Sequence, residues 1–337
     1  MSTYAFVASH HTVDLTTVAA LSAGASGVPD VLASDMARQL GVKGAVVLAT
    51  CNRLEMYVQL HVSAHVPMVR ELIVDSIARA SGLDTELVNS SFDVYADDEA
   101  ARHLLTVASG LESAVVGERE IAGQVRRALA AAQAKAQEEG VTLPGELVQL
   151  FEHAAHTARQ VGQHTALGAQ GRSIVSVALD LADEVAEKDW STRRALIFGT
   201  GAYAGATIAA LRERGCTDIW VNSRSGRAAE FAAKREVSAV PVDGMEQAMA
   251  SADVIIGCSG GSDPLLPEQI PGGHHTILDL ALSRDFDPSV ADLPNVELIT
   301  LESVRLAAPE ETEESVATAT RIVESELAAF LSRQRSR

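Results

Sequence analysis

The sequence has few cysteines, few aromatic residues and no long apolar run, and each shortage excludes a class of protein. Its three cysteines, Cys51, Cys216 and Cys258, are odd in number and far apart, which argues against a disulfide framework and for a reducing compartment. None of them forms a C-x-x-C pair, so the sequence indicates no structural zinc site and no metal. No apolar run reaches the roughly 18 residues that a membrane helix needs. A disulfide-rich secreted scaffold and a membrane span are therefore excluded.

The amino terminus and the charge balance exclude two further classes. No basic region precedes an apolar stretch within Met1 to Tyr4, so the sequence indicates no secretory signal peptide. Acidic residues outnumber basic residues by 45 to 27, and the formal net charge of −18 argues against broad, non-specific nucleic-acid binding without excluding a local basic face. This acidic balance, with 4% aromatic residues, is typical of a bacterial cytoplasmic protein. We therefore expect a cytoplasmic protein that binds no membrane.

The apolar residues that are present suffice for two or three domains, since 47% of the 337 residues are hydrophobic. Strand-like and helical segments are mixed in the first 95 residues, which predicts a small α+β domain. Helical character then dominates residues 97–188. After residue 194 strands and helices alternate, which predicts a doubly wound parallel sheet. Its predicted strands are residues 195–198, 218–221, 239–242, 253–257 and 276–280.

A glycine-containing turn follows the first of these strands and begins a helix. It has the pattern G-x-G-x-x-G/A, formed by Gly199, Thr200, Gly201, Ala202, Tyr203 and Ala204. The first glycine permits a tight turn, the second lets the backbone approach a pyrophosphate, and Ala204 allows close helix–strand packing. The phosphates would meet free N–H groups at the positive end of the helix. The pattern predicts a Rossmann-type dinucleotide site, with a plain strand–helix turn as the alternative.

The choice of dinucleotide depends on the end of the next strand. NAD sites usually carry an acidic residue there, which binds the ribose hydroxyls. Here Ser223 and Arg224 follow the strand, with Ser225 and Arg227 close behind, and no acidic residue is present. Guanidinium and hydroxyl groups suit a 2′-phosphate, so NADPH is favoured over NADH. The alternative is that the two arginines only begin a solvated helix.

Cys51 lies in a short connection between two strand-like segments, residues 45–48 and 54–62. Thr50, Asn52 and Arg53 flank it. A cysteine that serves packing alone would more often lie inside a strand. Cys216 and Cys258 are predicted to be packing residues. The nearby guanidinium of Arg53 favours a thiolate. Cys51 is therefore a candidate nucleophile, and the alternative is a half-buried thiol in a turn.

A thiol nucleophile together with a hydride donor narrows the chemistry. A thiolate attacks an activated acyl carbon and forms a thioester, which a hydride reduces to an aldehyde. Residues 110–124 contain polar interruptions in an apolar, glycine-containing segment, and these predict either a pocket for a polar substrate or the caps of a helix–loop–helix. We therefore expect an oxidoreductase that interconverts an acyl group and an aldehyde.

The chain resembles the glutamyl-tRNA reductases over essentially its whole length. The resemblance rests on ordered motifs: Thr50–Arg53 with Glu55 and Tyr57, His103–Leu104, Ser109–Ser113, Gly117–Glu118, Ile121, Gly123–Val125, the glycine turn, and Asp279–Ala281 with Arg284–Asp285. This resemblance implies NADPH-dependent reduction of glutamyl-tRNA(Glu) to glutamate-1-semialdehyde. That reaction opens the C5 route to 5-aminolevulinate and porphyrins.

The resemblance also implies roles for individual residues. Cys51 would attack the glutamyl ester, and His103 would transfer protons. Arg53 would pair with the glutamyl carboxylate, helped by Thr50 and Asn52. The same pocket would be lined by Ser113, Glu118, Arg119, Glu120 and Gln124. NADPH would bind the glycine turn together with Ser223 and Arg224.

The expected fold is an α/β and α+β multidomain protein with four parts. An N-terminal α+β catalytic domain (1–155) is followed by a helical connector (156–190), a Rossmann-type NADP-binding domain (191–306) and a long C-terminal spinal helix (307–337). The family continues into a dimerisation domain that this sequence does not include, so its homodimer is left open here. The resemblance also suggests glutamate-1-semialdehyde aminomutase as a partner. The sequence departs from the family at Val13–Leu15, Gly162, Ser223 and Ser283.

Two rival functions remain open from the sequence. A shikimate-dehydrogenase-like oxidoreductase would explain the nucleotide half but would give Cys51 no role. A catalytically inactive homologue could bind tRNA or a partner enzyme, although the intact Cys51 and His103 argue against it.

Overall fold

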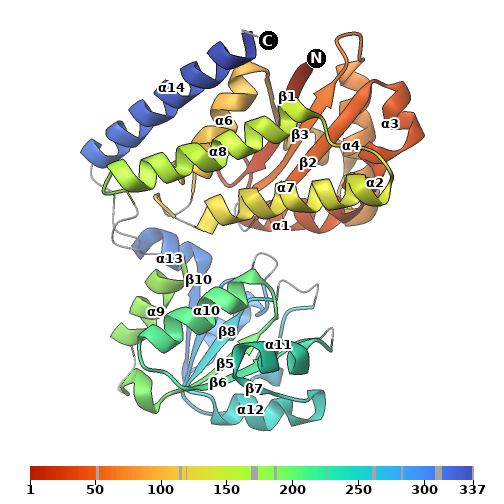
Figure 1. Cartoon of the computed structure of the whole chain (residues 1–337). Coiled ribbons are helices and arrows are strands. Elements are labelled where there is room, and N and C mark those ends of the chain that lie inside the picture. The colour runs from red at the N-terminus through yellow and green to blue at the C-terminus, as the bar shows by residue number, and fades with distance from the viewer. Residues whose placement is uncertain are drawn as a thin grey trace. The chain divides into compact units, whose positions relative to one another are not determined.

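The computed structural model describes residues 1–50, 53–113, 116–118, 120–167, 174–185, 188–224, 226–259, 263–281, 284–307 and 313–335. The chain forms two compact units, one of Met1–Gly171 with Glu310–Arg337 and one of Arg172–Pro309. We call them unit 1 and unit 2 and describe each by itself (Figure 1). Within the described residues no helix is both long enough and apolar enough to cross a membrane.

Unit 1 is built on a four-stranded antiparallel sheet with strand order β2-β3-β1-β4. Its elements are β1 (Ser2–Ser9), α1 (Leu15–Gly24), η1 (Ala25–Gly27), α2 (Val28–Ala33), α3 (Asp35–Gln39), β2 (Val42–Ala49), β3 (Arg53–Leu60), α4 (Val66–Ser81), α5 (Thr85–Ser90), β4 (Asp93–Ala96), α6 (Asp98–Ala108), α7 (Glu120–Glu138), α8 (Gly145–His164) and α14 (Glu313–Arg335).

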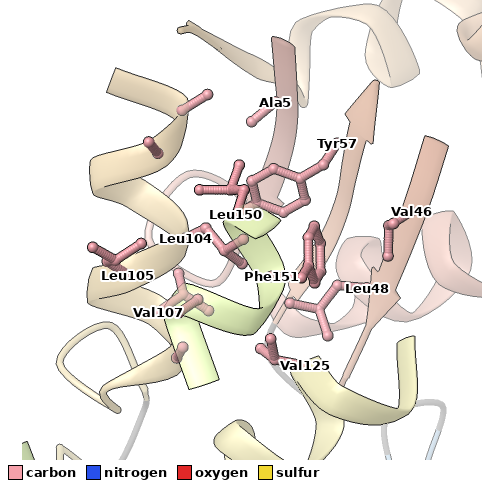
Figure 2. Packing of buried hydrophobic residues seen from close by; sticks show 14 of the residues in the cluster. Ala5, Val46, Leu48, Tyr57, Leu104, Leu105, Val107, Val125, Leu150 and Phe151 are labelled. Atoms are coloured by element: carbon pink, nitrogen blue, oxygen red, sulfur yellow. The ribbon is translucent and has the colours of Figure 1, made fainter. Parts of the chain in front are cut away.

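Helices cover both faces of this sheet, because successive strand residues point to opposite sides. Phe6, Leu54 and Met56 pack in one core with residues of α1, α2 and α4. Tyr57 packs in the other core with α6, α7 and α8, and its ring meets Phe151 edge-on at 5.2 Å between ring centroids (Figure 2). The central strand β3 is consequently buried along its whole length.

The long C-terminal helix α14 returns to unit 1 and packs on α6 and α8 (Figure 1). Its buried face, which includes Val323, Leu327 and Phe330, joins the core that contains Tyr57. Arg102 of α6 adds a salt bridge of 2.8 Å to Glu324. The predicted long C-terminal helix is therefore confirmed.

Unit 2 is a six-stranded parallel sheet with strand order β10-β9-β8-β5-β6-β7. Its elements are α9 (Ile174–Glu184), η2 (Trp190–Thr192), β5 (Arg194–Phe198), α10 (Ala202–Glu213), β6 (Asp218–Asn222), α11 (Ala228–Arg235), β7 (Ser238–Ala239), η3 (Val242–Gly244), α12 (Met245–Ser251), β8 (Val254–Gly257), η4 (Pro267–Gln269), β9 (His275–Asp279), η5 (Pro288–Asp292), β10 (Val296–Thr300) and α13 (Leu301–Ala307).

The strand order of unit 2 is that of a doubly wound dinucleotide-binding sheet, and the predicted fold class is confirmed. The order reverses at β5, whose neighbours are β6 and β8. Two details of the prediction were wrong. β7 ends at Ala239, because Pro241 has no N–H with which to continue the ladder. β10 was not predicted, because this edge strand is only partly buried and lacks a long apolar run.

The sequence predicted four parts, whereas the structure forms two compact units. Helix α8 runs without interruption from Gly145 to His164, across the predicted limit at residue 155. The separation of a connector from the catalytic domain stays a prediction.

Candidate active site

Three polar side chains share one face of the buried strand β3. Arg53, Glu55 and Tyr57 alternate with Leu54 and Met56, so they point toward α6 and α8 while the apolar residues enter the opposite core. Arg53 is 1% exposed, and Glu55 and Tyr57 are fully buried. Charged groups at such depth require partners, because an unpaired buried charge is costly.

The carboxylate of Glu55 supplies those partners. Its Oε1 accepts a hydrogen bond of 2.7 Å from Arg53 Nη1 and lies 3.0 Å from His103 Nε2. Its Oε2 accepts a hydrogen bond of 2.7 Å from the hydroxyl of Tyr57. His103 comes from α6, and its ring stacks on Tyr95 of β4 at 4.9 Å between centroids. One carboxylate therefore ties the start of β3 to a helix some fifty positions later in the sequence.

These contacts decide the charge of Glu55. Burial by itself raises the pKa of this carboxyl, but the charges of His103 and Arg53 and the hydrogen bonds from His103 and Tyr57 outweigh it and bring the pKa to about 2. The pKa of Tyr57 is raised well above its usual value by burial and by the neighbouring charge of Glu55. Glu55 is therefore ionised, and Tyr57 is a neutral donor, across the working pH range of most enzymes.

Arg53 also anchors the polar segment after α6, since its Nη2 donates to the backbone oxygen of Glu112. This segment folds back on itself, with Gly117 N donating to Gly110 O at 2.9 Å. Gly110 has a φ of +77°, and a Cβ there would lie 3.0 Å from the backbone oxygen of Glu118. A glycine at this position is therefore required for the close return of the chain.

Two carboxyls near this segment, Glu118 and Glu120, have raised pKa values, and the charge of Arg53 acts on Glu118. Glu118 is 5% exposed, and its Oε1 has no hydrogen-bond partner among the described residues. Burial, followed by the charge of Glu120, raises the pKa of Glu118 to about 7, and Arg53 opposes this rise. Burial likewise raises the pKa of Glu120. A buried carboxyl with an unused oxygen, such as Glu118, is suited to meeting a polar group of a ligand.

The structure places several other predicted site residues in the same unit. Thr50 is 7% exposed, and its N–H donates to the backbone oxygen of Arg53 at 2.9 Å. Ser113 is 7% exposed, and Gln124 is half-buried on α7. Cys51, Asn52 and Arg119 lie outside the described residues.

In unit 2 the glycine turn follows β5 as predicted. Gly199 has a φ of +116°, and a Cβ there would lie 2.7 Å from the backbone oxygen of Cys258. Its N–H donates to Asn222 O of the neighbouring strand at 2.8 Å. Only glycine fits a backbone that is both left-handed and this close to β8.

The next part of the turn is open. A Cβ on Gly201 would meet no atom within 4 Å, so a ligand can approach this backbone. Gly201 is the residue before the first turn of α10, and Ala204 of that helix is fully buried. Thr200 Oγ1 lies 3.5 Å from Ser223 Oγ at the end of β6, and Arg224 beside it is exposed. Open space beside the backbone at the start of a helix, together with a basic side chain, fits a phosphorylated dinucleotide.

A pair of buried aspartates supports the chain beside this turn. Asp285 accepts a hydrogen bond of 2.7 Å from Ser259 N, directly after Cys258. Asp279 accepts from the N–H groups of Ala281, Asp285 and Phe286 at 3.2 to 3.3 Å. Burial raises the pKa of Asp279 to about 6. These contacts give the two motif aspartates a structural role behind Gly199.

The sequence did not assign roles to Glu55, Tyr57, Tyr95 and Glu112, which the structure brings together with Arg53 and His103. One pattern in the sequence could have indicated this network: Arg53 and Glu55 alternate with apolar residues inside a strand. Among the described residues, no group of three or more His, Cys, Asp or Glu side chains is placed to hold a metal ion.

Comparisons with known proteins agree for both units. Residues 7–165 match the family described as glutamyl-tRNAGlu reductase, N-terminal domain, and residues 180–307 match shikimate / quinate 5-dehydrogenase. The chain is 59% identical over 326 residues to a glutamyl-tRNA reductase of Kocuria rhizophila, covering 96% of this chain and 72% of that protein. The chain belongs to the glutamyl-tRNA reductase family.

Other members of this family are also similar. A glutamyl-tRNA reductase of Micrococcus luteus is 51% identical over 353 residues, covering all of this chain and 76% of that protein. A solved glutamyl-tRNA reductase from Methanopyrus kandleri is 24% identical with a TM-score of 0.47, covering 99% of this chain and 80% of that one. The predicted resemblance is confirmed, and because it includes the part with Cys51, the shikimate-dehydrogenase-like alternative is not favoured.

Proposed function

We propose that this chain reduces glutamyl-tRNA(Glu) to glutamate-1-semialdehyde with NADPH and releases the tRNA. This is the first step of 5-aminolevulinate and porphyrin biosynthesis by the C5 route. The observation that carries the proposal is the 59% identity to a glutamyl-tRNA reductase over 96% of the chain. The buried ionic network of unit 1 and the open glycine turn of unit 2 are compatible with it.

The reaction proceeds through an acyl group held on the protein. The thiolate of Cys51 attacks the ester carbonyl of the glutamyl group, and the bond to the tRNA ribose oxygen breaks. That oxygen takes a proton as the tRNA leaves, and a thioester remains on Cys51. NADPH, when bound, supplies the hydride that reduces this thioester. The resulting thiohemiacetal loses the aldehyde and regenerates the thiol.

Residues of unit 1 bind the glutamyl group in this proposal. Arg53 uses two of its five N–H groups for Glu55 and Glu112, which leaves three for the glutamyl carboxylate. Glu118, with its unused Oε1, accepts from a polar group of the substrate. Thr50, Asn52, Ser113, Arg119, Glu120 and Gln124 line the same pocket. His103 gives and takes the protons that the leaving tRNA and the thiohemiacetal require.

Residues of unit 2 bind NADPH. The backbone of Gly199, Thr200, Gly201, Ala202, Tyr203 and Ala204 meets the pyrophosphate at the start of α10, where the helix dipole is positive. Ser223 and Arg224 meet the 2′-phosphate of the ribose, since no carboxylate directly follows β6.

Several wider features belong to the same proposal. The catalytic domain is residues 1–155, with a connector at 156–190, and the protein acts in the cytoplasm, where charged tRNA is made. The aldehyde product is reactive, which supports direct transfer to glutamate-1-semialdehyde aminomutase. A homodimer, as in the family, would be tested by light scattering.

The direct test measures NADPH oxidation with glutamyl-tRNA, and with free glutamate and shikimate as alternative substrates. We expect oxidation with glutamyl-tRNA alone, and none with Cys51→Ser. Oxidation with shikimate would restore the dehydrogenase alternative. Binding of glutamyl-tRNA without any oxidation would instead indicate an inactive homologue.

A further inference from the structure

The carboxylate of Glu55 contacts two side chains to which the proposed function assigns separate tasks. Arg53 is proposed to bind the substrate carboxylate and His103 to transfer protons, yet both lie against the same oxygen, Oε1. We propose that Glu55 is a positioning residue that holds His103 as the Nε2–H tautomer and orients Arg53 beside it. This inference rests on the proposed function for its catalytic meaning, but its structural content can be tested alone.

The donors and acceptors around Glu55 determine the tautomer of His103. An ionised carboxylate only accepts hydrogen bonds, so each group that contacts Glu55 must donate. Arg53 Nη1 and the Tyr57 hydroxyl are donors at 2.7 Å, and His103 Nε2 lies at 3.0 Å. Nε2 must therefore carry a proton. In a neutral imidazole the other nitrogen, Nδ1, is then the acceptor that remains for proton exchange.

Other contacts keep the two residues in this arrangement. Glu55 is fully buried in the central strand, and its second oxygen is occupied by Tyr57. The ring of His103 stacks on Tyr95 with an interplanar angle of 21°. The His103 side chain is 14% exposed, so the ring is held on one side and reachable on another. The pKa of Glu55 at about 2 agrees with a carboxylate that stays an acceptor.

The arrangement has a chemical consequence for the proposed reaction. A fixed negative charge beside Nε2 stabilises the imidazolium that forms when Nδ1 takes a proton. Because Arg53 shares the same oxygen, loss of the carboxylate would disturb substrate binding and proton transfer together. Glu55 touches neither the substrate carbonyl nor the hydride in this scheme and acts through its two neighbours.

The first test needs no variant of Glu55. Nitrogen-15 NMR of the full chain with labelled histidine, with the His103 signals assigned by comparison with His103→Gln, reports the tautomer at a pH where the ring is neutral. We expect the Nε2–H form. An Nδ1–H form, or an equal mixture of the two, would overturn the inference whether or not the chain reduces glutamyl-tRNA.

The second test removes the charge with Glu55→Gln. The amide oxygen can still accept, but Arg53 and the imidazolium lose their counter-charge, so we expect kcat to fall about 100-fold, within the usual contribution of general acid–base catalysis. The KM for NADPH should not change. The control is Glu146→Gln, which removes an exposed carboxylate that accepts from Gln59 on the same strand and should leave kcat unaltered.

The readouts separate failure of this inference from failure of the proposed function. If Glu55→Gln keeps the kcat of the unaltered chain while His103→Gln loses activity, the positioning role of Glu55 is refuted and the proposed reaction stands. If the unaltered chain itself shows no oxidation of NADPH with glutamyl-tRNA, the proposed function fails. The NMR result would then still decide the tautomer.

Discussion

The two units of this chain present their polar groups in opposite ways. In unit 1 charged side chains are buried against one another, and Arg53, Glu55 and His103 form one connected network. In unit 2 the turn around Gly199 offers backbone N–H groups and open space, with little side-chain material. Unit 1 depends on charged side chains that contact one another, whereas unit 2 depends on glycines that have no Cβ atom. Substitutions that remove a member of this network should therefore damage unit 1, and those that add a group at the glycine turn should damage unit 2.

The sharpest test of this comparison adds one methyl group to unit 2. Gly199→Ala places a Cβ 2.7 Å from the backbone oxygen of Cys258 and forces alanine into a φ of +116°. We expect loss of NADPH affinity by more than about 100-fold and a free energy of unfolding lowered by at least about 2 kcal/mol, from backbone strain and the clash. Fluorescence measures the stability, because both tryptophans, Trp190 and Trp220, lie in unit 2.

The matched control for that change is Gly201→Ala, whose Cβ meets no protein atom within 4 Å. We expect the stability of unit 2 to be unaltered and NADPH affinity alone to fall. If both alanine variants lost stability equally, the close approach at Gly199 would not be the cause.

A second prediction concerns the buried carboxyl of Glu118 in unit 1. Its pKa in the folded chain is raised from 4.5 to about 7, so the folded chain holds this proton more tightly than the unfolded chain. The resulting stabilisation is fully present below pH 4.5 and is lost as the pH rises through 7. At about 1.4 kcal/mol per pKa unit, the loss is on the order of 3 kcal/mol.

Glu118→Gln removes this titration. The difference in the free energy of unfolding between Glu118→Gln and the unaltered chain should shift by about 3 kcal/mol in favour of the variant between pH 4.5 and about 7. Urea denaturation followed by far-ultraviolet circular dichroism measures it. The exposed Glu71→Gln on α4 is the control. A difference that stays constant with pH would show that Glu118 is not buried as described.

A third prediction concerns a side chain of unit 2 that would distinguish NADPH from NADH. Arg224 is exposed beside Ser223, so its removal should not disturb folding. We expect Arg224→Ala to raise the KM for NADPH about 10- to 100-fold, because a charge-assisted hydrogen bond to a phosphate contributes about 1.5 to 3 kcal/mol. The KM for NADH should stay the same. Equal effects on both cofactors would place Arg224 away from the 2′-phosphate.

The smallest change in stability is expected at a glycine that neither a turn nor a close contact requires. Gly162 lies in the helix α8, and a Cβ there would meet nothing within 4 Å. Gly162→Ala should therefore raise the free energy of unfolding by about 0.5 to 1 kcal/mol and leave catalysis unchanged. Thermal denaturation measures this change. A loss of stability would mean that this glycine, unlike Gly201, has a close neighbour.

The glycine turn of unit 2 could be predicted from the sequence better than the buried network of unit 1. The turn at Gly199 was predictable because its residues are contiguous and follow a strand, and every physical requirement is local. The network around Glu55 was not, because its partners come from β3, β4 and α6 and meet only when the sheet and helix pack. The alternation of Arg53, Glu55 and Tyr57 showed a strand, but not that both faces of it are buried.

Edge strands were the other weak point. β10 is only partly buried, so its pattern resembles that of a loop, and Pro241 closes β7 earlier than the apolar residues around it suggested. For β10 the position at the edge of the sheet outweighs local propensity, and for β7 the missing N–H of Pro241 ends the strand.

The most direct test of the account is whether an acyl group rests on Cys51 before the hydride arrives. The chain would be incubated with glutamyl-tRNA in the absence of NADPH, quenched in acid and measured by mass spectrometry, intact and after digestion. We predict one glutamyl group on the peptide that contains Cys51, which disappears when NADPH is added and is absent from Cys51→Ser. No adduct, or an adduct that persists on another residue in Cys51→Ser, would contradict the thioester route.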